Sequence, residues 1–138
     1  MSDNIFIDTN ILIYAIDDND ISKQKISNDI IRRLSENGGV ISTQVLQEFF
    51  NIATKKLQLS NDYVRQLLQR LVDCFKVHRN SESDIFRAID ISSKTQFSFW
   101  DSLIISAAIA EKCNILYSED LNNGQLVESL KIINPLKN

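Results

Sequence analysis

The sequence predicts an α/β fold with a central, mainly parallel sheet. Short apolar segments rich in Ile and Leu alternate with longer amphipathic segments along the chain, and this alternation is typical of strands separated by crossover helices. Only 3 Gly and 1 Pro occur among the 138 residues, which leaves little room for long irregular loops. The length suits a single domain, residues 1–138, that buries its core without disulfides.

The first half of the chain supplies two of the expected strands and four of the expected helices. We expect strands at residues 4–8 and 40–41, and helices at residues 10–16, 21–36, 44–56 and 60–73. Apolar residues recur at helical spacing in the longer segments. The sequence Asn37-Gly38-Gly39 stops the second helix, while Ser42 or Thr43 and then Ser60 are suited to cap the helices that follow.

The second half continues the alternation, with strands at residues 75–77, 114–118 and 130–133 and helices at residues 83–95 and 101–112. We expect the helix at 83–95 to use Ile85, Phe86 and Ile89 as its apolar face, with Ile91 as a further candidate. The helix at 101–112 is apolar nearly all round and is therefore expected to be buried. The strands together predict a four- to five-stranded sheet, with neither an internal repeat nor a domain boundary.

Composition excludes several classes of protein. No apolar run approaches the roughly 20 residues that cross a bilayer, and no secretory signal is evident, so we expect a cytoplasmic protein without a membrane partner. The chain has one His, His78, and two Cys without a CxxC spacing, which argues against zinc sites and against Ser-His or Cys-His catalysis. The net charge of −3 weighs against broad nucleic-acid binding. Any catalysis is expected to use carboxylates.

Two acids follow expected strands. Asp8 ends the first strand, and Asp120 comes shortly after the strand at 114–118. The carboxyl ends of parallel strands are where ligands bind in such sheets. Each acid also has a simpler explanation, since Asp8 could cap the short helix that follows it and Asp120 could be an ordinary polar loop residue.

Two further acids lie on expected helices. Asp101 opens the apolar helix at 101–112, where negative charge is favoured at a helix N-terminus, yet burying an acid there is costly without a partner. Glu48 lies one turn into the helix that follows the second strand, and its simpler explanation is an exposed helix flank.

Together these four acids predict a metal site. Carboxylates that converge at one edge of a sheet repel one another and destabilise the fold unless a cation lies among them. Oxygen ligands of this kind favour Mg²⁺ or Mn²⁺, and such an ion activates water and stabilises charge during phosphodiester hydrolysis. We therefore predict a metal-dependent nuclease with Asp8, Glu48, Asp101 and Asp120 as its acidic set.

Four fragments in order carry a family resemblance: FIDTN at residues 6–10, LQEF at 46–49, FWDSLI at 99–104 and LYSEDLNNG at 116–124. The chain resembles PIN domains over residues 4–135, and most closely the VapC-type toxins of bacterial toxin–antitoxin pairs. The resemblance implies a three-layer α/β/α sandwich and an endoribonuclease in which the four acids hold Mg²⁺ or Mn²⁺. It also implies an RNA substrate such as tRNA or rRNA, a cognate antitoxin protein and a homodimer.

The resemblance extends to residues near the acids. Asn10 and Ser118 match small polar positions and are expected to support the acids or orient the substrate. The fourth motif reads Ser-Glu-Asp-Leu, so Glu119 could share or replace the role given to Asp120, although the offset from the strand favours Asp120.

Other interpretations remain open at this stage. The chain could be a PIN nuclease that processes RNA outside a toxin pair, or a PIN scaffold that binds without catalysis. A phospho-acceptor receiver domain also has an acidic rim, but the strand at 75–77 lacks its acceptor aspartate. Trp100 is expected in the core, with stacking on a base as the alternative, and His78 is assigned no role because no partner is visible.

Overall fold

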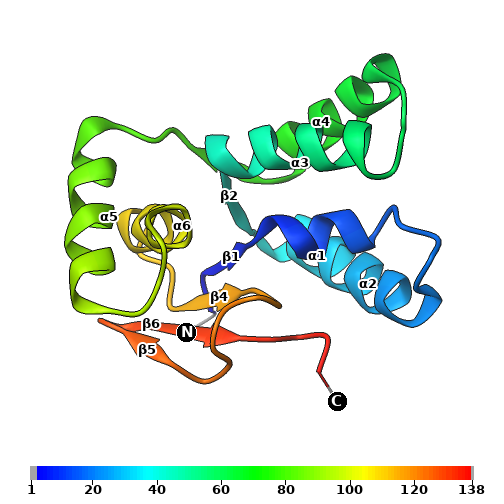
Figure 1. Ribbon diagram of the computed structural model, residues 1–138. Coiled ribbons are helices and arrows are strands. Elements are labelled where there is room, and N and C mark those ends of the chain that lie inside the picture. Colours follow the sequence, from blue (N-terminus) through cyan, green and yellow to red (C-terminus); the bar gives the residue numbers. More distant parts are fainter. Residues whose placement is uncertain (1–2, 138) are drawn as a thin grey trace.

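The computed structural model describes residues 3–137 and confirms the α/β fold, with a sheet between two groups of helices (Figure 1). Within these residues the sheet has six strands in the order β3-β2-β1-β4-β6-β5. Their bounds are β1 Ile5–Ile7, β2 Val40–Ser42, β3 Lys76–His78, β4 Ile115–Tyr117, β5 Leu126–Val127 and β6 Leu130–Ile133. Every neighbouring pair is parallel except β5 with β6.

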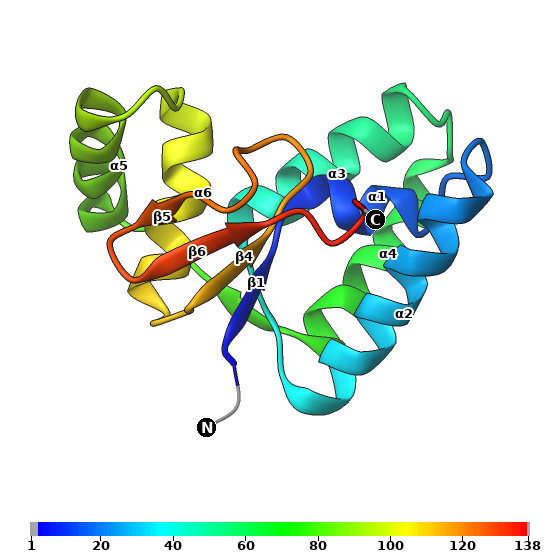
Figure 2. The same cartoon turned by 90° about the horizontal axis from the view of Figure 1, so that it is seen from below.

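Helices cover both faces of this sheet. Their bounds are α1 Thr9–Tyr14, α2 Ile21–Asn37, α3 Thr43–Lys55, α4 Asn61–Cys74, α5 Glu82–Lys94 and α6 Phe99–Ala110. Figure 2 shows α5 and α6 on one side of the sheet and α1 to α4 on the other. This is the three-layer arrangement that the family resemblance implied.

The sequence explains why these elements form where they do. The strands are short runs of branched apolar residues, and Phe6, Ile41 and Leu116 on the three central strands are fully buried. Burying side chains of this size supplies most of the favourable free energy of folding. Helix α2 ends at Gly38, whose φ of 97° is a left-handed conformation that glycine adopts without strain.

Serine side chains begin most of the longer helices. The side chain of Ser42 accepts from the backbone N–H of Val45 at the start of α3, and Ser60 plays the same role for α4. Such caps satisfy backbone donors that the helix itself leaves free. Both caps agree with the sequence prediction, which named Ser42 as one of two alternatives.

The register of the two central strands places the first candidate acid. Strands β1 and β4 pair Ile7 with Tyr117, and the backbone N–H of Asp8 donates to the carbonyl of Tyr117 at 2.9 Å. Asp8 and the residues after Tyr117 therefore leave the sheet side by side at its carboxyl edge. Ligand sites in parallel sheets form at this edge.

Two details of the predicted fold were wrong. The expected four or five strands are six within residues 3–137, because the two-residue strand β5 is too short to produce a recognisable pattern. The expected apolar face of α5 points outward, since Ile85, Phe86 and Ile89 are 40%, 65% and 46% exposed. The helix packs through Asp84, Ala88 and Ile91, of which only Ile91 was among the residues expected on that face.

No helix in residues 3–137 is both long enough and apolar enough to span a membrane.

Candidate functional site

A pocket of about 270 Å³ opens at the carboxyl edge of the sheet, and all four predicted acids line it. Its lining is Asp8, Thr9, Asn10, Glu48, Asn51, Ile52, Asp101, Ile104 and Asp120. We call it the acid pocket. Its residues come from the β1–α1 junction, α3, α6 and the segment after β4, so segments far apart in sequence build one site.

Asp8 is the N-cap of α1 and faces the pocket at the same time. Its Oδ1 accepts from the backbone N–H of Thr9 at 2.8 Å, and its Oδ2 accepts from the hydroxyl of the buried Ser118 at 2.8 Å. The simpler explanation of Asp8 as a cap is thus correct without excluding the pocket. Residues that follow the two central strands, β1 and β4, therefore orient both carboxylate oxygens of Asp8. Ser118 lies beside one of the acids, as the family resemblance implied.

Glu48 is fixed by two hydrogen bonds from neighbouring elements. The hydroxyl of Thr9 donates to its Oε1 at 2.6 Å, and the amide Nε2 of Gln44 donates to its Oε2 at 3.1 Å. The same Gln44 amide donates to the backbone carbonyl of Trp100 at 3.1 Å. Glu48 is half-buried rather than an exposed helix flank, and its position is set by α1, α3 and α6 together.

Asp101 lies in the first turn of α6 but is not its cap. Ser98 caps the helix, and its hydroxyl oxygen accepts from the backbone N–H of Asp101 at 3.1 Å. The Asp101 carboxylate is therefore not required for capping. It lines the acid pocket together with Ile104, one turn further along the same helix.

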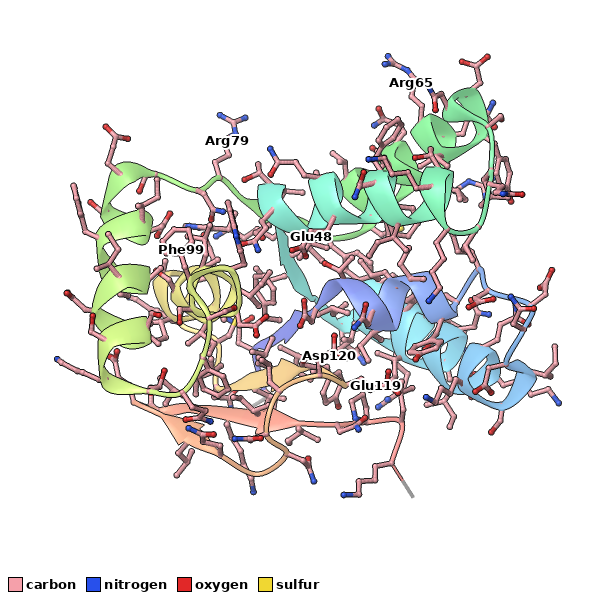
Figure 3. The ribbon with its side chains drawn as sticks, in the orientation of Figure 1. Glu48, Arg65, Arg79, Phe99, Glu119 and Asp120 are labelled. Atoms are coloured by element: carbon pink, nitrogen blue, oxygen red, sulfur yellow. The ribbon has the colours of Figure 1, made fainter. Side chains whose placement is uncertain are left out.

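The segment after β4 separates Asp120 from Glu119. Asp120 is exposed at the pocket, where Asn10 donates to its Oδ2 through the side-chain amide. Glu119 points away from the pocket toward the last residue of α1, where it accepts from the Tyr14 hydroxyl at 2.6 Å and pairs with Lys23 Nζ at 2.6 Å. Figure 3 shows the two labelled residues at this segment. Asp120 lines the pocket and Glu119 does not, so the structure favours Asp120 of the two alternatives.

Burial and the charges of neighbouring acids raise the pKa values of two pocket acids, Asp8 and Asp101. Burial raises the pKa of Asp8 to about 6, hydrogen bonds from Thr9 and Ser118 oppose this, and the charges of Glu48 and Asp101 add to the rise. The pKa of Asp101 is also raised, first by burial and then by the charges of Asp120 and Glu48. No Lys, Arg or His in residues 3–137 forms an ion pair with any of the four acids. The pocket therefore concentrates uncompensated negative charge.

The comparison with known families supplies the identification. The PIN domain family matches residues 5–124, which include all four acids. The chain belongs to the PIN-domain family. No curated relative matches it in sequence.

Solved structures of this PIN domain's fold include bacterial toxins. Mycobacterium tuberculosis VapC20, described as a sarcin-ricin-loop-cleaving toxin, is 16% identical and superposes with a TM-score of 0.66 over 85% of this chain and 90% of its own. VapBC2 from Rickettsia felis, bound to a DNA fragment from its promoter, is 21% identical, with a TM-score of 0.67 over 93% and 96%. DNA-bound VapBC from Salmonella typhimurium is 15% identical, with a TM-score of 0.68 over 95% and 97%. At these identities the similarity establishes the fold.

The donor chemistry of this PIN domain's pocket fits a hard divalent cation. Its polar lining consists of four carboxylates with amide and hydroxyl oxygens nearby, the ligand type that Mg²⁺ and Mn²⁺ prefer. Burial and, after it, mutual repulsion raise the pKa of Asp8 and Asp101, and a cation would offset both effects by favouring the charged carboxylates. Across residues 3–137, no three His, Cys, Asp or Glu side chains form a ready-made metal site, so the fit rests on donor chemistry and charge.

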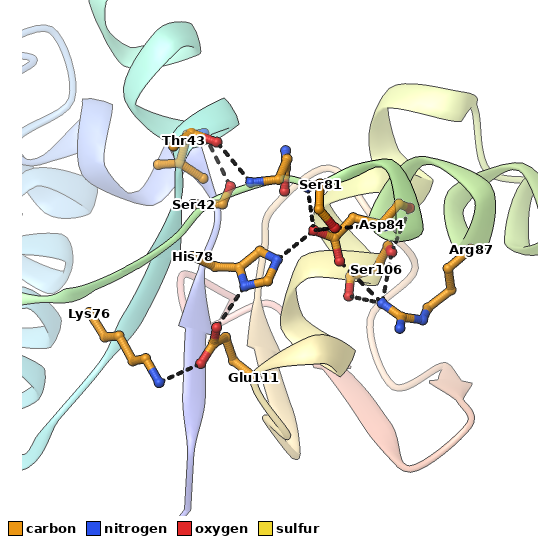
Figure 4. A network of polar contacts seen from close by, with 11 residues as sticks. Ser42, Thr43, Lys76, His78, Ser81, Asp84, Arg87, Ser106 and Glu111 are labelled. Carbon is orange, nitrogen blue, oxygen red and sulfur yellow. Dashed lines mark hydrogen bonds and ion pairs between the residues drawn. The ribbon is translucent and has the colours of Figure 1, made fainter.

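Sequence reasoning missed a network of paired charges on the PIN domain. His78 Nδ1 lies 2.6 Å from Glu111, and its Nε2 lies 2.7 Å from Asp84 (Figure 4). Lys76 pairs with Glu111 at 2.7 Å, and Arg87 pairs with Asp84 at 3.3 Å. We call these five residues the His78 network. Its partners lie up to 33 residues from His78, so no local sequence signal identifies them.

The predicted placement of Trp100 was also wrong. Its side chain is 63% exposed rather than buried in the core. Trp100 occupies the first turn of α6, where the helix has only begun to enter the core, and the apolar residues that pack begin at Leu103. The alternative, stacking of Trp100 on a base, stays a prediction.

Proposed function

We propose that this PIN domain is a metal-dependent endoribonuclease that hydrolyses RNA phosphodiester bonds at the acid pocket. One observation carries the proposal: four carboxylates from four separate segments line one pocket without a cation partner in residues 3–137. Clustered carboxylates without a cation lower the free energy of unfolding. Their presence is therefore explained by a function and not by the stability of the fold. Asp8, Glu48, Asp101 and Asp120 are the proposed metal ligands and catalytic residues.

The neighbouring polar residues prepare the carboxylates for this task. Thr9 contacts both Asp8 and Glu48, through its backbone N–H and its hydroxyl respectively. Ser118 and Asn10 hold Asp8 and Asp120 in the same way. Carboxylates held by fixed donors lose little conformational freedom when they bind a charged ligand. Mg²⁺ or Mn²⁺ bound among them would activate a water molecule and stabilise negative charge on the phosphate.

We further propose that the chain is the toxin of a toxin–antitoxin pair. Its structural neighbours support this, since they include a toxin described as cleaving the sarcin-ricin loop and VapBC complexes. The proposal includes a cognate antitoxin, an RNA substrate such as tRNA or rRNA, a cytoplasmic location and a homodimer. The exposed apolar face of α5, formed by Ile85, Phe86 and Ile89, is a surface suited to protein contacts.

The first experiment tests cleavage. Purified protein is incubated with a mixed pool of tRNA and structured RNA in Mg²⁺, in Mn²⁺ and in EDTA. We expect cutting that requires the metal and that falls about 100-fold or more in Asp101→Asn, since the variant loses one charge-stabilising ligand. Asp90→Asn, an exposed acid on α5 away from the pocket, is the matched control and should cut normally. Equal cutting by wild type and Asp101→Asn would overturn the proposal.

A second experiment separates a toxin from an RNA-processing nuclease. The wild-type chain and Asp101→Asn are expressed under tight control in a bacterial host. We expect growth arrest with the wild type only, relieved by co-expression of the small protein encoded beside it. RNA cleavage in vitro without growth arrest would favour the processing nuclease, and an absence of both would favour a PIN scaffold.

A further inference from the structure

An exposed tryptophan lies directly before one of the pocket acids. Trp100 is the only tryptophan of the chain and is 63% exposed, although burying its ring would contribute strongly to stability. Phe99 packs against it edge to face, with ring centroids 5.1 Å apart and an interplanar angle of 78°. This contact limits the motion of the Trp100 ring while leaving it available to a ligand.

An unpaired arginine lies near the same edge of the sheet. Arg79 directly follows β3, is exposed, and forms no ion pair within residues 3–137. In Figure 3 its labelled side chain projects outward from the segment between β3 and α5. An unpaired guanidinium of this kind is a ready partner for a phosphate.

The start of α3 connects both residues to the acid pocket. Gln44 donates to Glu48 in the pocket and to the backbone carbonyl of Trp100. The adjacent Thr43 accepts from the backbone N–H of Asn80, the residue after Arg79, at 3.3 Å. Consecutive residues of α3 therefore hold the backbone of Trp100 and of the Arg79 segment next to the pocket.

This junction also contains buried acceptors that the fold leaves without partners. Within residues 3–137, four buried side-chain polar atoms lack a hydrogen bond, and two of them are Gln44 Oε1 and Asn80 Oδ1. An unsatisfied buried acceptor costs free energy. Gln44 holds the backbone of Trp100, and Asn80 directly follows Arg79, so both acceptors belong to the junction that carries these two residues.

We propose that Trp100 and Arg79 form a nucleotide-binding rim beside the acid pocket, in which the indole stacks on an unpaired base of single-stranded RNA and the guanidinium binds its phosphate. The inference rests on the proposed function and narrows its substrate to RNA with unstacked bases. Aromatic stacking combined with a nearby cation is the usual way to bind single strands, and bases paired within a duplex cannot stack on a side chain.

The charges of the site favour RNA over a protein as the ligand of this rim. The carboxylates of the acid pocket repel phosphates until a cation is bound, so substrate affinity must come from groups at the pocket's edge. Arg79 supplies attraction for a phosphate, and Trp100 supplies affinity that does not depend on charge. The apolar face of α5, formed by Ile85, Phe86 and Ile89, offers a separate surface for protein partners.

The experiment uses the fluorescence of Trp100, which is free of interference because the chain has no other tryptophan. The full chain carrying Asp8→Asn is titrated in Mg²⁺ with a single-stranded RNA of mixed sequence, about 12 nucleotides long. The RNA is checked on a gel afterwards to show that it stays intact. We expect saturable quenching by the single strand and much weaker quenching by a blunt duplex of the same sequence.

Affinity measurements with labelled RNA determine how much Trp100 and Arg79 each contribute to RNA binding. In the same background, Trp100→Ala should weaken binding about tenfold, and Trp100→Phe should recover part of the loss. Arg79→Ala should weaken binding and reduce the slope of log affinity against log salt by about one. The matched controls are Tyr63→Ala and Arg65→Ala, both exposed on α4, which should stay within about twofold of the parent.

Two results would overturn the inference while leaving the proposed function in place. One is RNA binding that leaves Trp100 fluorescence unchanged, with Trp100→Ala binding as well as Tyr63→Ala. The other is normal RNA affinity in Trp100→Ala with a changed sedimentation coefficient, which would assign Trp100 to a protein interface. Intact RNA after incubation with wild type in Mg²⁺ and Mn²⁺ would instead refute the proposed function.

Discussion

The acid pocket and the His78 network both gather carboxylates, but they treat the charge in opposite ways. In the network each acid has cation partners, and hydrogen bonds from Lys76 and His78 hold the pKa of Glu111 below its usual value. In the pocket the pKa of Asp8 is raised to about 6, because burial and neighbouring acids disfavour its charged form. The paired charges of the His78 network therefore stabilise the fold. The unpaired carboxylates of the acid pocket carry a free-energy cost that a bound cation would relieve.

The His78 network and the acid pocket lie at opposite ends of α6. The His78 network joins the edge strand β3 to α5 and to the end of α6 (Figure 4). The side chains of His78, Asp84 and Glu111 are largely buried, with Asp84 only 4% exposed, whereas that of Lys76 is 69% exposed. The acid pocket lies at the opposite end of α6, where Asp101 occupies the first turn. We infer that the network fixes the helix on which Asp101 is carried.

The largest expected effect comes from breaking the network. Asp84→Asn should lower the free energy of unfolding by about 3 kcal/mol, because removing one charge of a buried ion pair leaves its partners unpaired. Urea unfolding followed by circular dichroism measures the change. Asp90→Asn on the same helix should alter stability by no more than about 0.5 kcal/mol. A loss no larger than that of this control would show that the network contributes little.

The next effect is stabilisation of the fold by bound Mg²⁺, which should depend on the acid pocket and not on the His78 network. Mg²⁺ at a hundred times its Kd should raise the free energy of unfolding of the wild type by about 2.7 kcal/mol, by mass action. Asp84→Asn should be less stable without metal but should gain the same free energy of unfolding from Mg²⁺. Asp101→Asn should lose most of this gain. Thermal unfolding with and without EDTA provides the measurement. An equal increment in Asp101→Asn would place the cation elsewhere.

A smaller effect of opposite sign is expected from Asp8→Asn in EDTA. The substitution removes a charge that burial and nearby acids disfavour, so the free energy of unfolding should rise by about 1 kcal/mol. The amide oxygen of Asn can still accept from the backbone N–H of Thr9, and its NH2 group can donate to the Ser118 hydroxyl oxygen. Chemical unfolding in EDTA tests the sign, and a clear loss of stability would mean that the capping role of Asp8 dominates.

The smallest effect is a pH dependence of the network. Burial alone would lower the pKa of His78, but hydrogen bonds from its ring to Glu111 and Asp84 and their negative charges raise it above 6.5 overall. A raised histidine pKa contributes stability that is complete below pH 6.5 and lost as the pH rises through the folded-state value. Unfolding from pH 6 to pH 9 should show this loss in the wild type but not in His78→Gln. Parallel curves would contradict it.

The sequence by itself determined the order of the helices and of every strand except β5, and it showed which acids follow strands. Runs of branched apolar residues mark the strands, Ser42 and Ser60 cap the helices as expected, and Asp8 and Asp120 follow strands that lie side by side in the sheet. These features depend on local patterns and on the general rule for parallel sheets, so they are visible without coordinates.

Only the tertiary structure decided which side chains meet and which face solvent. It separated Asp120 from Glu119 by giving Glu119 to Tyr14 and Lys23. It turned the large apolar residues of α5 outward, because the buried Asp84 is paired with His78 and the small Ala88 is available for packing. Those contacts depend on residues distant in sequence, and the free energy of a buried charge depends on its partners rather than on its own identity.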